Sequence, residues 1–209
     1  MTLDLFADED LQQPARLQSI SEQGFVLRGF ALPWAEALLQ ALAGVLIQSP
    51  FRHMQTPGGF TMSARLSSCG ELGWTSDCNG YSYSPVDPLR KQPWPAMPDT
   101  FLALAEAAAG AAGFEHFVPD ACLINCYVPG AKMSLHQDKN ERSLEAPIVS
   151  ISLGLPAVFQ FGGFERSDPA QRISLFHGDI VVSGCVERLL FYGVLPIQPG
   201  QHPVLGEQR

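Results

Sequence analysis

The sequence lacks any hydrophobic run that approaches the roughly 18 residues of a membrane-spanning helix. Its first residues also lack the basic and apolar segments of a secretory signal. These absences predict a cytoplasmic protein with no membrane partner. The five cysteines are an odd number without paired spacing, which favours buried free thiols over disulfides or a zinc site. Free thiols agree with a reducing cytoplasm.

Positive charge is scarce as well. The 13 lysines and arginines stand against 21 acidic residues, for a net charge of -8, which argues against broad, non-specific nucleic-acid binding. A local basic groove is compatible with this total. At 209 residues, we expect a single domain over residues 1–209 and a monomer. The candidate side chains for the groove are Arg52, Arg65, Lys132, Lys139, Arg142 and Arg166.

Two helices are expected in the first half of the chain. Pro33 opens the first, and its apolar residues recur on one helical face until Ser49, which precedes a proline. The second begins near Pro98 and runs to about Ala112, where Gly113 stops it. Both are apolar enough to lie against a sheet.

From residue 121 onward the pattern is that of short β-strands. Runs of β-forming residues alternate with glycine, proline or polar turns, and no helical pattern separates them. Helices followed by many short strands favour an α+β fold, or a β-sandwich or barrel with flanking helices. The expected strands cover residues 24–30, 121–127, 148–153, 158–161, 172–176, 179–182 and 188–192.

Residues 51–95 differ from the rest of the chain. They are rich in turn residues, and Asn79 followed by glycine is a strong hairpin signal. Trp74, Tyr81 and Tyr83 cluster here, and the two tyrosines share one strand face because they are two positions apart. An aromatic, polar segment of this kind suits a planar ligand. The same aromatics would equally serve to pack a core, and the pattern leaves both interpretations open.

His136 and Asp138 form the most informative pair. In an extended chain their side chains point to the same side. An imidazole nitrogen and a carboxylate oxygen supply two ligands of a 2-His-1-carboxylate iron(II) site, which leaves positions open for co-substrate and oxygen. Asn125 and Tyr127 share a strand face upstream, where they would hydrogen-bond an organic acid. On its own, a His-x-Asp pair is more often part of a surface loop.

Several segments match one enzyme family in the same order. Residues 123–139 read Leu-Ile-Asn-Cys-Tyr-Val-Pro-Gly-Ala-Lys-Met-Ser-Leu-His-Gln-Asp-Lys. This stretch resembles the iron-site segment of the AlkB family of DNA-alkylation repair dioxygenases. The resemblance covers roughly residues 20 to 205. Residues 146–156 and 159–163 match the family's core, and residues 56–63, 72–75, 80–85 and 93–98 resemble its nucleotide-recognition lid.

The resemblance implies a fold and an activity. The fold is a double-stranded β-helix (jelly roll) core over about 115–209, with flanking helices and an N-terminal nucleotide-recognition lid over about 51–95. The activity is oxidative demethylation of N-alkylated bases, of the 1-methyladenine and 3-methylcytosine type. It uses Fe(II), O2 and 2-oxoglutarate and releases formaldehyde, succinate and CO2. The implied partner is alkylated single- or double-stranded DNA, with RNA as a further candidate.

The resemblance also assigns roles to matching residues. His136 and Asp138 become the iron ligands and catalytic pair. Asn125, Tyr127 and Arg209 become contacts of 2-oxoglutarate. Asn140 stands where the bacterial enzyme has an acidic residue that contacts the base, so the change concerns base preference. The implied substrate-binding residues are Met62, Trp74, Tyr81, Tyr83, Asn140 and Arg166.

The chain departs from the family in two places. The family's second iron histidine lies in Phe-Tyr-His-Gly, whereas here Tyr192 is followed directly by Gly193, as though one residue were deleted. A deletion in a strand turns the following residues to the other face. His202 would replace the ligand only if the last strand shifted. Arg209, the last residue, matches the first arginine of the family's Arg-x-Asn-x-Thr-x-Arg strand.

These departures keep two alternatives to the active demethylase open. One is a catalytically impaired relative that binds lesion-bearing or single-stranded nucleic acid. The other is a dioxygenase of the same fold that acts on a protein side chain or a small molecule, against which the aromatic set in residues 51–95 argues.

Overall fold

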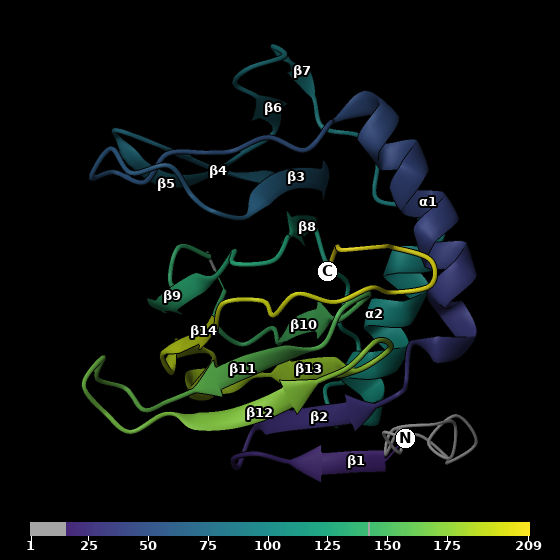
Figure 1. Ribbon diagram of the computed structural model, residues 1–209, viewed down its shortest axis with the longest axis vertical. Helices are drawn as coiled ribbons and strands as arrows, with labels where there is room; N and C mark the ends of the chain where they lie inside the picture. Colours follow the sequence, from purple (N-terminus) through teal and green to yellow (C-terminus); the bar gives the residue numbers. More distant parts are fainter. Residues whose placement is uncertain (1–15, 142) are drawn as a thin grey trace.

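Two four-stranded antiparallel sheets form the centre of the molecule (Figure 1). The computed structural model describes residues 16–209 apart from residue 142. The first sheet has the order β1 (Arg16–Ser19), β2 (Gly24–Arg28), β13 (Ile180–Ser183) and β10 (Ile148–Ile151). The second has the order β12 (Gln171–Leu175), β11 (Ala157–Phe161), β14 (Tyr192–Val194) and β9 (Met133–His136).

Alternate residues of the first sheet pack in opposite directions. Val26 and Val181 join the buried cluster that contains Phe159 of the second sheet. Their neighbours Leu27 and Ile180 join the cluster on the helical side. Because successive strand residues point to opposite faces, the first sheet lies between the second sheet and the helices. The helical residues of that cluster are Leu38, Leu104, Ala108 and, just past the second helix, Ala112.

The two helices confirm the sequence prediction closely. A short 3-10 turn over Leu32–Trp34 leads into α1 (Ala35–Gln48), and α2 covers Asp99–Ala111. Gly113 follows α2 with φ +88°, a backbone conformation that favours glycine. Within the described residues, no helix is long and apolar enough to cross a bilayer.

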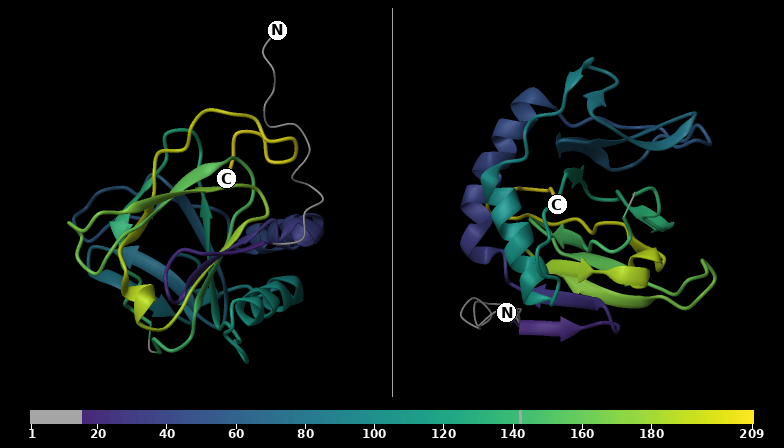
Figure 2. Two further views of the ribbon diagram at one scale, coloured as in Figure 1. Left: turned by 90° about the horizontal axis from the view of Figure 1, so that it is seen from below. Right: turned by 180° about the vertical axis from the view of Figure 1, so that it is seen from behind.

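The remaining strands form small sheets stacked on one side of the two main sheets (Figure 1). β4 and β5 form a hairpin whose tip points away from the helices, on the same side as β9 and β14, in both views (Figures 1 and 2). Trp94 packs beneath this hairpin so closely that a Cβ on Gly73 would lie 2.2 Å from its ring. The pairs are β3 (Arg65–Gly70) with β8 (Ala121–Cys126), β4 (Gly73–Asp77) with β5 (Gly80–Ser84), and β6 (Val86–Asp87) with β7 (Gln92–Pro93).

The predicted strand over residues 188–192 is wrong. That stretch begins in a 3-10 turn over Cys185–Leu189, and β14 starts only at Tyr192. Arg188 is buried at 3% exposure, and its guanidinium donates to the carbonyls of Ser143 and Ala146. The turn lets the Arg188 side chain reach the loop that follows Asp138. Because these contacts involve residues far away in the sequence, the local sequence pattern could not predict the turn.

The prediction of free cysteines is confirmed, but the prediction that they are buried holds only in part. All five are free thiols in the structure. Cys69 and Cys126 are buried and Cys122 is half-buried, whereas Cys78 and Cys185 are exposed. The exposed pair lies in a hairpin turn and a 3-10 turn, where backbone geometry brings side chains to the surface.

Candidate active site

His136 is the last residue of β9, and Asp138 follows in the adjoining loop. His136 Nε2 lies 3.7 Å from Asp138 Oδ1. On the other side of the ring, Nδ1 lies 2.9 Å from the carbonyl oxygen of Ser134. A carbonyl only accepts hydrogen bonds, so Nδ1 carries the proton and the Nε2 lone pair faces the carboxylate. Metal-binding imidazoles are oriented in this way by a second, hydrogen-bonded nitrogen.

Tyr192 completes this group. It stands directly opposite His136 in the pairing of β14 with β9, and the two ring centroids are 4.6 Å apart. Its hydroxyl donates to Asp138 Oδ2. Burial, followed by the charge of the Asp138 carboxylate, raises the pKa of Tyr192 well above its usual range. The imidazole nitrogen of His136 and the phenol oxygen of Tyr192 therefore both lie beside the carboxylate of Asp138.

The sequence departure after Tyr192 lies where β14 pairs with β9. The phenol itself faces His136, so no rearrangement is needed to bring β14 to the site. An ungapped reading anchored on Gly193 would have aligned Tyr192 with the expected histidine. Among the described residues, no three His, Cys, Asp or Glu side chains are grouped to hold a metal ion. The imidazole and carboxylate present are donors that suit iron, and the phenol of Tyr192 lies against both.

His202 does not replace the missing histidine. Its ring packs on that of His177, with centroids 4.5 Å apart. His202 Nδ1 accepts the main-chain N–H groups of Val204 and Leu205, and His177 Nδ1 accepts that of Gly154. Burial lowers the pKa of both histidines, and for His177 the neighbouring His202 adds to the effect.

Asn125 and Tyr127 lie at the end of β8 and just beyond it. Asn125 Oδ1 is buried without a hydrogen-bond partner in the described chain. The amide is thus uncommitted, and it suits a polar ligand. Tyr127 is buried, and its hydroxyl lies 3.8 Å from Met133 Sδ, which directs it toward β9. Burial raises the pKa of Tyr127 to about 12, so its hydroxyl is a donor at neutral pH.

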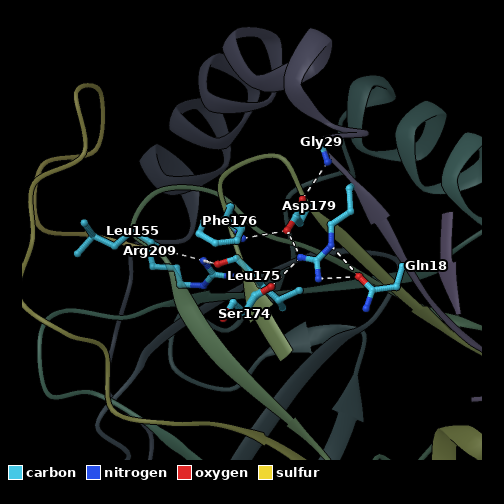
Figure 3. A network of polar contacts seen from close by, with 9 residues as sticks. Gln18, Gly29, Leu155, Ser174, Leu175, Phe176, Asp179 and Arg209 are labelled. Atoms are coloured by element: carbon cyan, nitrogen blue, oxygen red, sulfur yellow. Dashed lines mark hydrogen bonds and ion pairs between the residues drawn. The ribbon is translucent and has the colours of Figure 1, made fainter. Parts of the chain in front are cut away.

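Arg209 lies beside Tyr127, to which its main chain is hydrogen-bonded in both directions at 2.8 and 3.0 Å. Figure 3 shows its guanidinium reaching the carbonyl oxygens of Leu155 and Leu175, at 2.5 and 3.3 Å. Burial lowers the pKa of Arg209 to about 10, which leaves it charged at neutral pH. In the same view Asp179 accepts the main-chain N–H groups of Gly29 and Phe176. These contacts link the strand ends of the two main sheets.

The hairpin aromatics form one face. Trp74 pairs across the strands with Tyr83 and stacks on Tyr81, with centroids 5.5 Å apart and planes 19° from parallel. Tyr83 Oη donates to Glu141 Oε1 at 2.8 Å, which attaches the hairpin to the loop after Asp138. Tyr81 is 43% exposed, so a purely core role does not describe it.

The other predicted substrate residues are distributed around this loop. Asn140 is exposed, two positions after Asp138. Arg166 lies over the ring of Phe191 and lines, with Lys132, a groove of about 340 Å³ along β9. Met62 is half-buried in the segment before β3, where its main chain bonds to Met54.

The expected basic groove is only partly available. Arg52 is paired with Asp87 at 2.7 Å, and Arg65 lies over the ring of Phe51. Arg142 lies outside the described residues. The cations beside the candidate site are Lys132 and Arg166, together with exposed Lys139 in the loop.

Sequence reasoning missed three residues of this site. The sequence pattern predicts an ordinary strand residue at Tyr192 and gives no role to Glu141 or Arg188. Glu141 Oε2 lies 3.2 Å from Arg188, so these two hold the loop from below while Tyr83 holds it from above. For Tyr192, the comparison of the family's Phe-Tyr-His-Gly with the residues before Gly193 offered a signal. The contacts of Glu141 with Arg188 and Tyr83 could not be predicted, because they join positions far apart in the chain.

Comparison with known proteins identifies the family. The model of the 2OG-Fe(II) oxygenase superfamily matches residues 25–209. Alpha-ketoglutarate-dependent dioxygenase AlkB of Salmonella typhimurium is 56% identical over 99% of this chain and 94% of its own length. AlkB of Escherichia coli is 55% identical over 97% and 92%.

A solved structure agrees with this result. The structure of OsALKBH1 superposes with a TM-score of 0.76 at 26% identity, covering 90% of this chain and 91% of that one. The mostly antiparallel strands with few helices are thus those of a 2OG-Fe(II) oxygenase fold. The chain therefore belongs to the 2OG-Fe(II) oxygenase superfamily and, within it, to the AlkB dioxygenases.

Proposed function

We propose that this chain oxidatively removes methyl groups from bases of the 1-methyladenine and 3-methylcytosine type in DNA or RNA. O2 is the oxidant and would be activated by Fe(II) with 2-oxoglutarate as the co-substrate; formaldehyde, succinate and CO2 are released. One observation supports a base as the substrate. The Tyr83–Glu141 hydrogen bond brings an aromatic face beside the loop that carries Asp138.

In this proposal His136 and Asp138 hold the iron. Asn125 would donate to 2-oxoglutarate through its amide nitrogen and Tyr127 through its hydroxyl. The Asn125 amide oxygen is buried without a partner among the described residues, and the Tyr127 hydroxyl contacts only the Met133 sulfur there. Arg209 offers guanidinium N–H groups beyond the two carbonyl contacts it makes, and its charge suits a carboxylate.

The hairpin receives the base. A base inside a duplex cannot reach the iron, so it leaves the stack at a cost of about a few kcal/mol, least for a base that cannot pair normally. Stacking on an aromatic ring offsets about 1–3 kcal/mol of that cost per base. Trp74 and Tyr81 offer such rings, while Asn140 and Met62 would contact base edges. Lys132 and Arg166 suit the phosphate backbone.

The finer architecture follows from the same proposal. The two main sheets constitute a double-stranded β-helix, whose core is about residues 115–209 together with β1 and β2. Residues 51–95 act as its nucleotide-recognition lid. A single domain, a monomer and a cytoplasmic location remain predictions.

The test is the fate of a methylated base. Purified protein is incubated with Fe(II), 2-oxoglutarate and oxygen on oligonucleotides that carry one 1-methyladenine or one 3-methylcytosine. We expect loss of the methyl group and equal amounts of formaldehyde and succinate. An unmethylated oligonucleotide and the variant His136→Ala serve as controls. Succinate formation without demethylation of any methylated base would contradict the proposal and favour another substrate.

The catalytically impaired alternative is not favoured. Both close relatives are named as dioxygenases, and they match nearly the whole chain. The alternative was based on the absent histidine, and in this chain the Tyr192 phenol lies opposite His136.

A further inference from the structure

The position of Tyr192 is fixed by the sheet. β14 lies between β9 and β11, and Tyr192 is paired with His136 on one side and Phe161 on the other. Residues directly opposite in an antiparallel pair project to the same face. The ring is also close to Phe159, with centroids 5.8 Å apart. The phenol is therefore held on the face that carries the His136 imidazole.

The next residue reinforces this placement. Gly193 lies so close to β9 that a Cβ there would be 2.6 Å from the Met133 carbonyl oxygen and 3.1 Å from the Leu135 nitrogen. The pairing also has an irregularity between Tyr192 and Val194, where β9 contributes an extra residue. Such a bulge re-aims side chains, and here it accompanies the turn of Tyr192 toward the loop.

The Asp138 carboxylate lies beside the donor atoms of both His136 and Tyr192. Its Oδ1 is 3.7 Å from His136 Nε2, and its Oδ2 accepts the hydrogen bond of the Tyr192 hydroxyl. Loss of the phenol proton would leave the Tyr192 and Asp138 oxygens free to bind a cation. Carboxylate, imidazole and tyrosine oxygen are all established types of iron ligand in proteins.

We propose that Tyr192 Oη is the third protein ligand of the iron, so that the site is His136, Asp138 and Tyr192 rather than two histidines and a carboxylate. On binding, the phenol O–H bond breaks, an oxygen–metal bond forms and the proton passes to solvent, with no change in the oxidation state of the metal. The inference rests on the iron chemistry of the family and is independent of the nucleic-acid substrate.

A phenolate ligand has a consequence that distinguishes it from an imidazole. It brings a second negative charge to the site, beside that of Asp138, and so favours the ferric state more than a neutral imidazole does. It also gives ferric iron a charge-transfer absorption in the visible range, which neither histidine nor aspartate produces. That absorption reports coordination directly and requires no substrate.

The experiment loads the full chain with Fe(III) alone and records its visible spectrum. Affinity is measured separately with Mn(II) alone. We expect the absorption in the unaltered protein and its loss in Tyr192→Phe, which keeps the ring but removes Oη. Loss of the ligand should weaken Mn(II) binding at least about tenfold, since even outer contacts of a metal site contribute that much.

Two further variants make the result specific. Tyr192→His supplies the family's imidazole, so the absorption should be absent while Mn(II) affinity recovers relative to Tyr192→Phe. This variant also answers the concern that Tyr192→Phe is misfolded. Tyr83→Phe removes the neighbouring phenol that is bonded to Glu141, and the absorption should persist. Thermal melting of each variant checks the fold.

Several results would overturn the inference. These are an iron-loaded protein without the absorption, an absorption that survives in Tyr192→Phe, or equal Mn(II) affinity with and without Oη. Metal uptake by Tyr192→His but not by the unaltered chain would show that the phenol blocks the site. None of these outcomes depends on demethylation, so failure of the proposed substrate would be seen separately.

Discussion

The hydroxyl of Tyr83 donates to Oε1 of Glu141 over 2.8 Å, although the two residues are 58 positions apart. This contact joins the β4–β5 hairpin to the loop that follows His136 and Asp138. The other carboxylate oxygen lies 3.2 Å from the buried guanidinium of Arg188. The Glu141 carboxylate therefore connects the hairpin, the loop and the 3-10 turn. Substitutions of Tyr83 or Arg188 should consequently alter substrate binding.

Tyr83→Phe tests whether this contact positions the hairpin for substrate. A hydrogen bond to a partly buried charge contributes about 1 kcal/mol, so KM for a methylated oligonucleotide should rise about fivefold. The rate at saturating oligonucleotide should change less, because the iron ligands are untouched. Steady-state kinetics provide the measurement. Ser82→Ala, an exposed position on the other face of β5, is the matched control and should leave KM unchanged. Equal KM in both variants would show that the contact is only structural.

Asn125→Leu should separate stability from co-substrate binding. The change removes a buried oxygen that has no partner in the described chain, so the free energy of unfolding should stay constant or rise by about 1 kcal/mol. KM for 2-oxoglutarate should rise about tenfold, the effect of losing about 1.4 kcal/mol of binding. Urea unfolding and succinate formation measure the two effects. In Asn125→Asp, an added negative charge should lower both stability and co-substrate affinity. A destabilised Asn125→Leu with normal KM would assign Asn125 to the fold alone.

The helices and most strands were predictable because their signals are local. Apolar residues at helical spacing, with Pro33 before and Ser49 after, identify α1 without knowledge of any partner. The strand over 188–192 failed for the opposite reason. Whether Arg188 sits in a strand or a turn depends on carbonyl groups of Ser143 and Ala146, more than 40 positions away in sequence.

The site divides in the same way. His136 and Asp138 are only two positions apart, so their proximity can be predicted from local sequence. Tyr192 lies 54 positions from Asp138 and meets it only because β14 inserts between β9 and β11. The family's sequence pattern predicts a histidine near this position and therefore gives no role to a tyrosine.

Arg188→Met should be among the most destabilising changes near the site. It removes the donor to two loop carbonyls and leaves Glu141 with an uncompensated charge. Breaking a buried ion pair from one side costs about 3 kcal/mol or more. Urea unfolding monitored by tryptophan fluorescence measures the loss. Arg172→Met, at an exposed position of β12, should stay within about 0.5 kcal/mol. Similar values for both would mean that the loop is held by other contacts.

The histidine pair should make stability depend on pH in a mildly acidic range. Burial lowers the pKa of both His177 and His202 in the folded chain, and the proximity of His202 and Arg209 adds to the effect at His177. The unfolded chain then binds protons more readily than the folded one. Stability is complete above the unfolded histidine pKa of about 6.5 and falls as the pH drops through and below that value. Burial alone would raise the pKa of the Asp87 carboxyl, but the hydrogen bond and charge of Arg52 and the main-chain N–H donors together lower it, so Asp87 contributes only at more acidic pH.

Free energies of unfolding measured in urea between about pH 7.5 and 5.5 bracket that histidine range and should decrease toward the acid end. His202→Gln should reduce the slope, because it removes one titrating ring and the packing partner that disfavours charge on His177. His116→Gln is the control, since His116 is exposed and does not contact this pair. The readout is the slope with pH rather than the stability at one pH, so a uniform loss of stability from altered packing does not imitate the effect. An unchanged slope in His202→Gln would place the pH dependence elsewhere.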